Sequence, residues 1–142
     1  WLWPRRDAWV PRLIETIEAQ RGPVLLAAHS LGCIAVAHLP SALAPRIAGA
    51  LLVAPADPER RGPLADFAPV PHHRLPWPST VVASDNDPFC PVRLAAAYAR
   101  AWGSAFVRMP GAGHINVESG HGPWPDGLAL LQALDTPAAV SA

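Results

Sequence analysis

The chain has 142 residues, of which 51% are hydrophobic and 15% charged, and its formal net charge is zero. This length and composition predict a single globular α/β domain spanning residues 1–142, with a core of buried strands. No cluster of basic residues is long enough to follow a phosphate backbone, which disfavours nucleic-acid binding, and no apolar run is long enough to cross a membrane.

Alternating helices and strands are predicted along the chain from the spacing of apolar residues and the positions of Pro and Gly. Helices are predicted over residues 7–20, 31–39, 91–102 and 126–134, and strands over residues 24–28, 48–54, 79–84 and 105–109. Asp7 is expected to cap the first helix, and Pro11 to lie in or near its first turn. The proline-rich stretch 55–79 is predicted to be a long ordered connection, a kind of loop that is often functional. This alternation predicts a mainly parallel, doubly wound sheet with right-handed crossovers.

The two cysteines, Cys33 and Cys90, are too few for a disulfide framework, and no residues near them have metal-ligand spacing. We therefore expect a reducing, cytoplasmic location. All eleven basic residues are Arg, a composition typical of GC-rich bacterial genomes. The chain begins at Trp1 rather than Met, so we expect the true N-terminus to lie further upstream.

The stretch Ala28-His29-Ser30-Leu31-Gly32 lies between the first predicted strand, which is expected to be buried, and the helix predicted after it. A strand, a small-x-Ser-x-small turn and a helix together form a nucleophile elbow, in which small residues let the chain turn sharply. Such a turn leaves the serine hydroxyl exposed at its tip. Gly usually stands where this chain has Ala28, whose methyl group is expected to fit. Ser30 is therefore a candidate nucleophile, with a helix cap as the alternative role.

Acidic residues and a histidine follow two later strands of the predicted sheet. Asp85 and Asp87 come after the third strand, and His114 comes after the fourth. In such sheets ligands bind beyond the carboxyl ends of the strands, so these side chains are expected to meet Ser30. A serine hydroxyl needs a base to take its proton, histidine titrates near neutrality, and a carboxylate fixes the imidazole tautomer. The chain order Ser, Asp, His is also the order found in α/β-hydrolases.

Two of these candidates have a structural alternative as well. Asp85-Asn86-Asp87-Pro88 is a turn composition, so one of the two aspartates is expected to be structural. Asp87 is the preferred acid because it stands at the start of the next loop and reaches further, and Asp85 remains the alternative. His114 lies in a Gly-rich loop, where a solvated surface role is the alternative.

The remaining histidines and Cys33 are weaker candidates for chemistry. His29 is expected to pack beside the site, and His38 to lie near the C-terminus of the second helix. His72-His73 and His121 fall in predicted loops, where exposure to solvent is favoured over a place in the pocket. Cys33 is expected to fill space in the core.

Four motifs occur in one order along the chain: Ala-His-Ser-Leu-Gly-Cys, Val-Ala-Pro-Ala-Asp, Ala-Ser-Asp-Asn-Asp-Pro-Phe and Gly-Ala-Gly-His-Ile-Asn. Through them the chain, from about residue 3 to residue 134, resembles the YdeN/retinoblastoma-binding-protein-9 group of small α/β-hydrolase serine hydrolases. The resemblance implies a three-layer α/β/α fold, a triad that maps onto Ser30, Asp87 and His114, and esterase-type activity on small acyl esters. It also implies the lack of a large lid domain.

Members of that group begin with an additional strand and a loop rich in Gly, His and Trp, upstream of the part that matches Trp3-Pro4. We therefore expect this chain to lack its first strand and the oxyanion loop, which would expose the neighbouring sheet edge. The Leu31 backbone N–H is one expected oxyanion donor, and the second would come from that loop. Because one missing donor typically costs about 10²–10³ in kcat, we expect weak ester hydrolysis. Poor folding is the other expectation, because of the exposed sheet edge.

These observations together predict a serine hydrolase that cleaves small carboxylic esters through an acyl-enzyme on Ser30. A thioesterase or amidase with the same triad is one alternative, and a non-catalytic interaction protein on a hydrolase scaffold is the other. The expected partner is a small-molecule ester, and neither a metal nor an organic cofactor is implied. His29, Phe89 and Trp77 are candidates for the pocket wall, with packing in the core as the alternative for Phe89 and Trp77.

Overall fold

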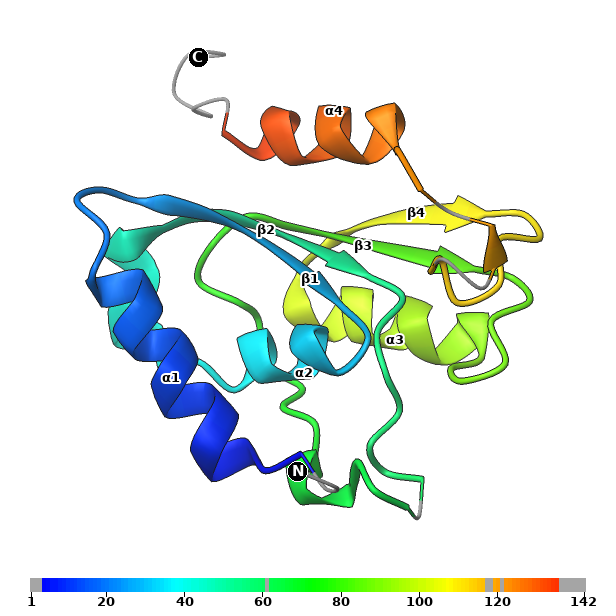
Figure 1. Ribbon diagram of the computed structural model, residues 1–142, viewed down its shortest axis with the longest axis horizontal. Helices are drawn as coiled ribbons and strands as arrows, with labels where there is room; N and C mark the ends of the chain where they lie inside the picture. Colours follow the sequence, from blue (N-terminus) through cyan, green and yellow to red (C-terminus); the bar gives the residue numbers. More distant parts are fainter. Residues whose placement is uncertain (1–3, 61, 117–118, 121, 136–142) are drawn as a thin grey trace.

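The computed structural model describes residues 4–60, 62–116, 119–120 and 122–135. Its middle layer is a parallel sheet in which the described residues form four strands, ordered β1-β2-β3-β4 (Figure 1). The strands are β1 (Val24–His29), β2 (Ile47–Val53), β3 (Ser79–Ser84) and β4 (Ala105–Met109). Because the strands are parallel, all their carboxyl ends meet at one edge of the sheet, where the predicted site residues follow β1, β3 and β4.

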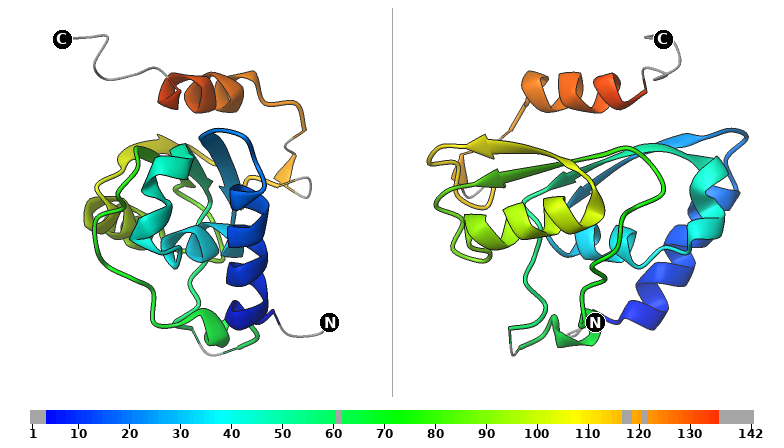
Figure 2. Two further views of the ribbon diagram at one scale, coloured as in Figure 1. Left: turned by 90° about the vertical axis from the view of Figure 1, so that its left-hand side faces the viewer. Right: turned by 180° about the vertical axis from the view of Figure 1, so that it is seen from behind.

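Helices cover both faces of this sheet (Figures 1 and 2). One face carries α1 (Arg6–Glu18), α2 (Leu31–Ala37) and α3 (Val92–Trp102), and the other carries α4 (Pro125–Leu134). These four helices and the four strands agree with the predicted elements, with ends that differ by a few residues at most. Two 3₁₀ turns, η1 (Ser41–Arg46) and η2 (Ala65–Phe67), were not predicted, because turns this short carry no apolar periodicity.

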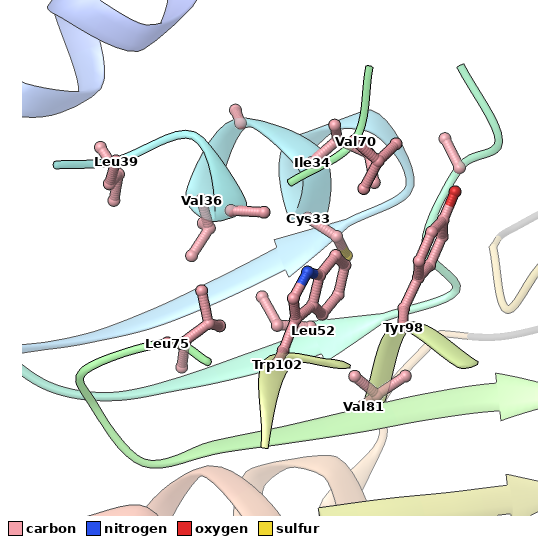
Figure 3. Packing of buried hydrophobic residues seen from close by; sticks show 14 of the residues in the cluster. Cys33, Ile34, Val36, Leu39, Leu52, Val70, Leu75, Val81, Tyr98 and Trp102 are labelled. Atoms are coloured by element: carbon pink, nitrogen blue, oxygen red, sulfur yellow. The ribbon is translucent and has the colours of Figure 1, made fainter. Parts of the chain in front are cut away.

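The core has two parts because neighbouring residues of the central strands face opposite layers. Leu52 and Val81 belong to the larger cluster, beneath α2 and α3, where Trp102 stacks on Tyr98 at a ring separation of 4.9 Å (Figure 3). Leu51, Val53 and Val82 belong to the smaller cluster, which α4 covers. Because both faces of β2 are covered, residues pointing to either side are apolar, and its sequence is a continuous apolar run.

The outer strands are less covered than the central ones. Every residue of β3 is buried, whereas β1 and β4 are partly exposed along their length. The prediction of a buried first strand over residues 24–28 is therefore wrong: Ala27 is exposed, and the other residues of that strand are only partly buried. Among the described residues β1 pairs with β2 alone, so it is an edge strand, and one side of its backbone has no neighbouring strand to shield it.

The start of α1 differs from its predicted form. Asp7 does not cap the helix: it lies in the first turn and accepts a hydrogen bond from Arg5. The first-turn N–H of Arg6 instead donates to the Asp66 carboxylate over 2.7 Å, so a side chain of η2 satisfies the helix terminus. Pro11 lies in the second turn, close to the first as predicted. The cap differs because the helix begins earlier than Asp7, where the segment around η2 supplies a partner.

Candidate active site

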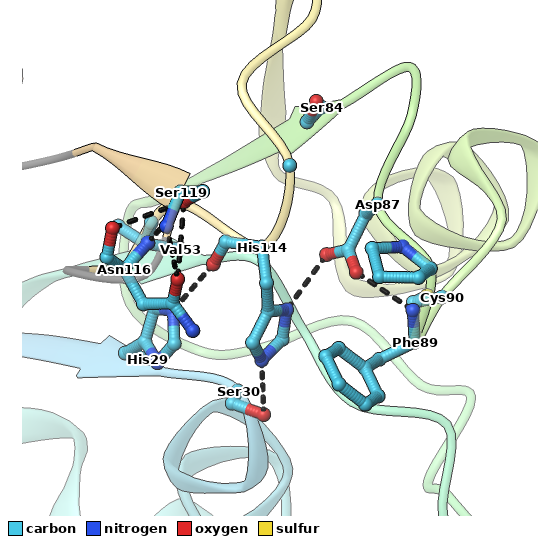
Figure 4. Close-up of polar contacts among 12 residues, drawn as sticks. His29, Ser30, Val53, Ser84, Asp87, Phe89, Cys90, His114, Asn116 and Ser119 are labelled. Carbon is cyan, nitrogen blue, oxygen red and sulfur yellow. Dashed lines mark hydrogen bonds and ion pairs between the residues drawn. The ribbon is translucent and has the colours of Figure 1, made fainter.

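Ser30 stands in a strained turn between β1 and α2. Its backbone has φ 56° and ψ −118°, a conformation that residues other than glycine rarely adopt. The Ser30 N–H donates to the Val53 carbonyl over 2.9 Å, and the Ala56 N–H donates to the Ser30 carbonyl over 3.2 Å. Residues at and just beyond the end of β2 thus fix the backbone of the serine, whose side chain points toward His114 (Figure 4).

The small residues on either side of this turn are in close contact. A Cβ atom on Gly32 would lie 3.5 Å from the Cβ of Ala28, which is an ordinary van der Waals separation. The methyl group of Ala28 therefore fits at the position where glycine is usual, as the sequence predicted. Leu31 is the first residue of α2, so its backbone N–H has no partner within the helix and stands beside Ser30.

Ser30, His114 and Asp87 form a continuous chain of hydrogen bonds (Figure 4). His114 Nδ1 lies 2.9 Å from Asp87 Oδ2, and His114 Nε2 lies 3.0 Å from Ser30 Oγ. With Nδ1–H donating to the carboxylate, Nε2 of the neutral ring can accept the serine hydroxyl proton. The side chain of Asp87 is 2% exposed and that of His114 11%. The second carboxylate oxygen of Asp87 accepts the Phe89 N–H over 2.8 Å, which fixes its orientation.

Asp85 lies apart from this chain. Its Oδ1 accepts the backbone N–H of Gly111 over 2.8 Å, and its Oδ2 lies 3.9 Å from Arg108 Nη2. The structure thus brings the preferred acid, Asp87, to the histidine and gives the alternative, Asp85, a place against the neighbouring loop.

The ring of His114 lies between two other rings. The ring centroids of His29 and Phe89 are each 4.7 Å from that of His114. The Nε2–H of His29 also donates to the main-chain carbonyl of His114 over 2.7 Å. A residue of the turn over residues 28–32, which we call the nucleophile turn, therefore bonds directly to the backbone of His114. This agrees with the prediction that His29 packs beside the site.

A pocket of about 570 Å³ opens at Ser30 and His114. Pro63, Leu64 and Phe89 form its apolar side, and Asp57, Arg60 and Asn116 line the remainder. Arg60 Nε and Asp57 Oδ2 are 3.7 Å apart, so their charges offset each other. Most of these lining residues come from the connection between β2 and β3, the stretch in which the sequence predicted a functional loop.

The three candidates for the pocket wall lie in three different places. Phe89 lines the pocket and is 56% exposed. His29 lines apolar grooves on the two sides of β1 instead. Trp77 is 4% exposed and lines a separate cavity at the opposite end of β3, so its prediction as a pocket residue is wrong. Its ring packs in the larger core cluster, which was the alternative for this residue.

The other histidines lie away from Ser30 or outside the described residues. His38 forms the C-cap of α2, as predicted, and its Nε2–H donates to the Phe67 carbonyl over 2.8 Å. Burial lowers the pKa of His38. His72 and His73 are exposed, also as predicted, and His121 lies outside the described residues.

Both cysteines are buried and chemically quiet. Burial raises the pKa of the Cys33 thiol, which packs beneath the nucleophile turn and donates to the Val53 carbonyl. Burial, followed by the charge of Asp87, raises the pKa of the Cys90 thiol to about 12. The thiolate is the reactive form of cysteine, so neither side chain competes with Ser30 as a nucleophile near neutral pH.

Neither a metal-binding cluster nor a membrane-spanning helix occurs in the described part of the chain. No three side chains of His, Cys, Asp or Glu within it gather where they could hold a metal ion. No helix within it is long and apolar enough to cross a membrane.

The sequence did not predict the residues that bond to the backbone of the loop carrying His114, residues 111–114. Ser84 and Asn86 accept the backbone N–H groups of Ala112 and Gly113. Their signal in the sequence is a run of four polar residues, 84–87, which begins at the last residue of a buried strand.

Comparison with known proteins gives one family and several similar structures. A family model described as serine hydrolase matches residues 1–133. No functionally curated protein matches the chain in sequence. A solved structure described as a YdeN-like hydrolase from Pectobacterium atrosepticum is 36% identical, with a TM-score of 0.83, over 95% of this chain and 71% of that chain.

Two further structures are more distant in sequence and similar in fold. The ydeN gene product of B. subtilis is 24% identical, with a TM-score of 0.73, over 94% of this chain and 76% of that chain. A monoacylglycerol lipase from Paleococcus ferrophilus is 14% identical, with a TM-score of 0.68, over 93% of this chain and 76% of that chain. These likenesses confirm the predicted doubly wound fold of the α/β-hydrolase type.

Proposed function

The chain belongs to the serine hydrolase family, and from this premise we propose that it cleaves small carboxylic esters through an acyl-enzyme on Ser30. The observation that carries the proposal is the chain of hydrogen bonds from Asp87 through His114 to Ser30, with lengths of 2.9 and 3.0 Å. A base within hydrogen-bond reach of a hydroxyl, and itself oriented by a buried carboxylate, is the arrangement that activates a serine.

In the acylation step, Ser30 Oγ attacks the ester carbonyl carbon while its proton passes to His114 Nε2. The carbonyl oxygen becomes an oxyanion, which the Leu31 N–H at the start of α2 is positioned to stabilise. Asp87 stabilises the imidazolium formed on His114 through the Nδ1–H bond. When the intermediate collapses, the proton on Nε2 goes to the departing alkoxide, which leaves as the alcohol, and the acyl group stays on Ser30.

Deacylation repeats these steps with water in place of serine. His114 Nε2 takes a proton from the water molecule as its oxygen attacks the acyl carbon. Collapse of the second intermediate returns that proton to Ser30 Oγ and releases the carboxylic acid. No step calls for a metal ion or a redox group.

The pocket at Ser30 supports short acyl groups. Its apolar side consists of Pro63, Leu64 and Phe89, which is enough surface for a few methylene groups. Asp57 and Arg60 also line the pocket, and their opposite charges offset each other. The pocket therefore offers little electrostatic attraction to a strongly anionic or a strongly cationic ester. We expect p-nitrophenyl acetate and butyrate to be cleaved faster than long-chain esters.

A fluorophosphonate probe and p-nitrophenyl acetate test the proposal together. Ser30→Ala is expected to abolish labelling and to lower kcat by up to about 10⁶-fold. Ser41→Ala is the matched control, because Ser41 is an exposed serine at the start of η1, away from the pocket. It is expected to label and turn over like the wild type.

The opposite result is equally clear. A well-folded wild-type chain that neither labels nor hydrolyses the ester contradicts the proposal and favours a non-catalytic interaction protein. Thioester and anilide substrates with the same acetyl group separate esterase, thioesterase and amidase activity, since only the leaving group then differs.

A further inference from the structure

Two four-residue segments lie opposite each other, one starting at the last residue of β3 and the other just beyond β4. We call residues 84–87 the acid segment and residues 111–114 the histidine loop. Each residue of the acid segment accepts one hydrogen bond from the histidine loop. The pairs are Asp85 Oδ1 with Gly111 N at 2.8 Å, Ser84 Oγ with Ala112 N at 2.9 Å, Asn86 Oδ1 with Gly113 N at 2.7 Å, and Asp87 Oδ2 with His114 Nδ1 at 2.9 Å.

Ser84 is the buried centre of this arrangement. Its side chain is fully buried, at 0% exposure, and its hydroxyl makes three hydrogen bonds. The hydroxyl donates to Asn86 Oδ1 over 2.6 Å and accepts the N–H groups of Asn86 and Ala112. One donor and two acceptor positions are the full capacity of a hydroxyl, so the group is completely satisfied.

The histidine loop depends on these partners because of its own backbone. Gly111 and Gly113 have φ values of 60° and 61°, which turn the N–H groups of the loop toward the acid segment. The Ala112 N–H is buried there, and a buried N–H without an acceptor is costly. Without Ser84 the loop would have to shift to recover a partner, and His114 would shift with it.

We propose that Ser84 and Asn86 are positioning residues, which set the distances from His114 to Asp87 and to Ser30. This inference rests on the proposed function, since it concerns the same three reacting side chains. Neither residue is offered as a catalytic group, because the contacts that carry the inference are to backbone N–H groups of the histidine loop. A displacement of about 1 Å in a catalytic group can cost about 10²-fold in rate.

The chain offers a matched control on the same strand. Ser79 and Ser84 are the first and last residues of β3, both are buried, and each hydroxyl is hydrogen-bonded. Ser84→Ala is expected to lower kcat for p-nitrophenyl acetate by about 10- to 100-fold, with KM little changed. Ser79→Ala removes an equivalent hydroxyl at the far end of the strand and is expected to keep kcat, even if it loses as much thermal stability.

A second pair of variants covers the case in which Ser84→Ala fails to fold. Asn86 is exposed, so its substitution spares the core. Asn86→Leu keeps the size of the side chain and removes the acceptor for both the Gly113 N–H and the Ser84 hydroxyl. It is expected to lower kcat and to cost some thermal stability through the buried hydroxyl. Asn86→Asp keeps an oxygen at the same place and is expected to restore most of the rate. Equal kcat in Asn86→Leu and Asn86→Asp overturns the inference.

The outcomes separate this inference from the proposed function. A wild-type chain that does not label with the fluorophosphonate refutes the proposed function itself. A wild-type chain that labels, with Ser84→Ala as fast as Ser79→Ala, leaves the proposed function standing and refutes the positioning role. Slow labelling of Ser84→Ala at wild-type affinity for the probe, beside normal labelling of Ser79→Ala, supports both.

Discussion

The nucleophile turn, residues 28–32, and the histidine loop, residues 111–114, are held in place by different means. The nucleophile turn is fixed by main-chain contacts: the N–H of Ser30 bonds to the end of β2, and its carbonyl accepts the N–H groups of Cys33 and Ala56. Its side-chain requirements are steric, since Ala28 and Gly32 need only be small. The turn therefore depends on small residues of its own and on main-chain groups of the neighbouring strand, and not on particular side chains from elsewhere.

The histidine loop is fixed by side chains of the acid segment, residues 84–87. Three of its backbone N–H groups bond to Asp85, Ser84 and Asn86, about 27 residues earlier in the chain. The comparison teaches that the two halves of the proposed site have different weaknesses. The nucleophile turn should tolerate changes that keep it small, whereas the histidine loop should fail when a distant hydrogen-bond acceptor is lost.

The largest expected effect distinguishes the two aspartates of the acid segment. Asp87→Asn places an amide opposite His114 Nδ1 and is expected to lower kcat by about 10⁴-fold, because the imidazole is then held in the wrong tautomer. Asp85→Asn is the matched control, since an amide oxygen still accepts the Gly111 N–H, and its effect on kcat is expected to be small. Steady-state hydrolysis of p-nitrophenyl acetate measures both. Similar losses in the two variants would show that the charge of the loop matters rather than the contact with His114.

A smaller effect is expected from adding one methyl group to each region. Gly113→Ala would bring a Cβ within 2.7 Å of the Ser119 Cβ at a φ of 61°. We expect a loss of about 1–3 kcal/mol in the free energy of unfolding and of about 10²-fold in kcat. Gly32→Ala meets only an ordinary contact and lies in α2, so it is expected to keep kcat and to gain up to about 1 kcal/mol. Urea denaturation and ester hydrolysis check both variants, and the reverse ranking would break the comparison.

The smallest effect concerns a histidine outside the proposed site. His38 donates to the Phe67 carbonyl, much as His29 donates to the His114 carbonyl, and burial lowers the pKa of His38. The unfolded chain then binds a proton more readily than the folded one. The contribution of His38 to the free energy of unfolding is therefore fully present above the usual histidine pKa of about 6.5. It falls as the pH drops through that value toward the lowered folded pKa.

Urea denaturation between about pH 5 and about pH 8 measures this slope. His38→Gln keeps an N–H donor for Phe67 and removes the titration, so it should flatten the curve. His72→Gln changes an exposed histidine and should leave the curve unchanged. A slope that survives His38→Gln assigns the pH dependence to another group.

Much of the fold could be predicted from local signals. Strands β3 and β4 match the predicted strands residue for residue, because their β-branched and apolar residues and the flanking Pro and Gly leave few alternatives. The nucleophile turn could be predicted because its signal, small residues on both sides of Ser30 between a strand and a helix, is also local. The start of α1 could not, because its terminal N–H bonds to Asp66, about 60 residues away, and no local pattern encodes that partner.

By itself the sequence determined the layers of the fold, the strained turn at Ser30 and the order in which the three candidate residues appear. These depend on apolar periodicity and backbone sterics, which act over a few neighbouring residues. Only the tertiary structure decided that Asp87 rather than Asp85 reaches His114, that Trp77 lies in the core rather than at the pocket, and that Ser84 and Asn86 hold the histidine loop. The physical reason is that hydrogen bonds join whichever donors and acceptors the parallel strands bring to one edge of the sheet.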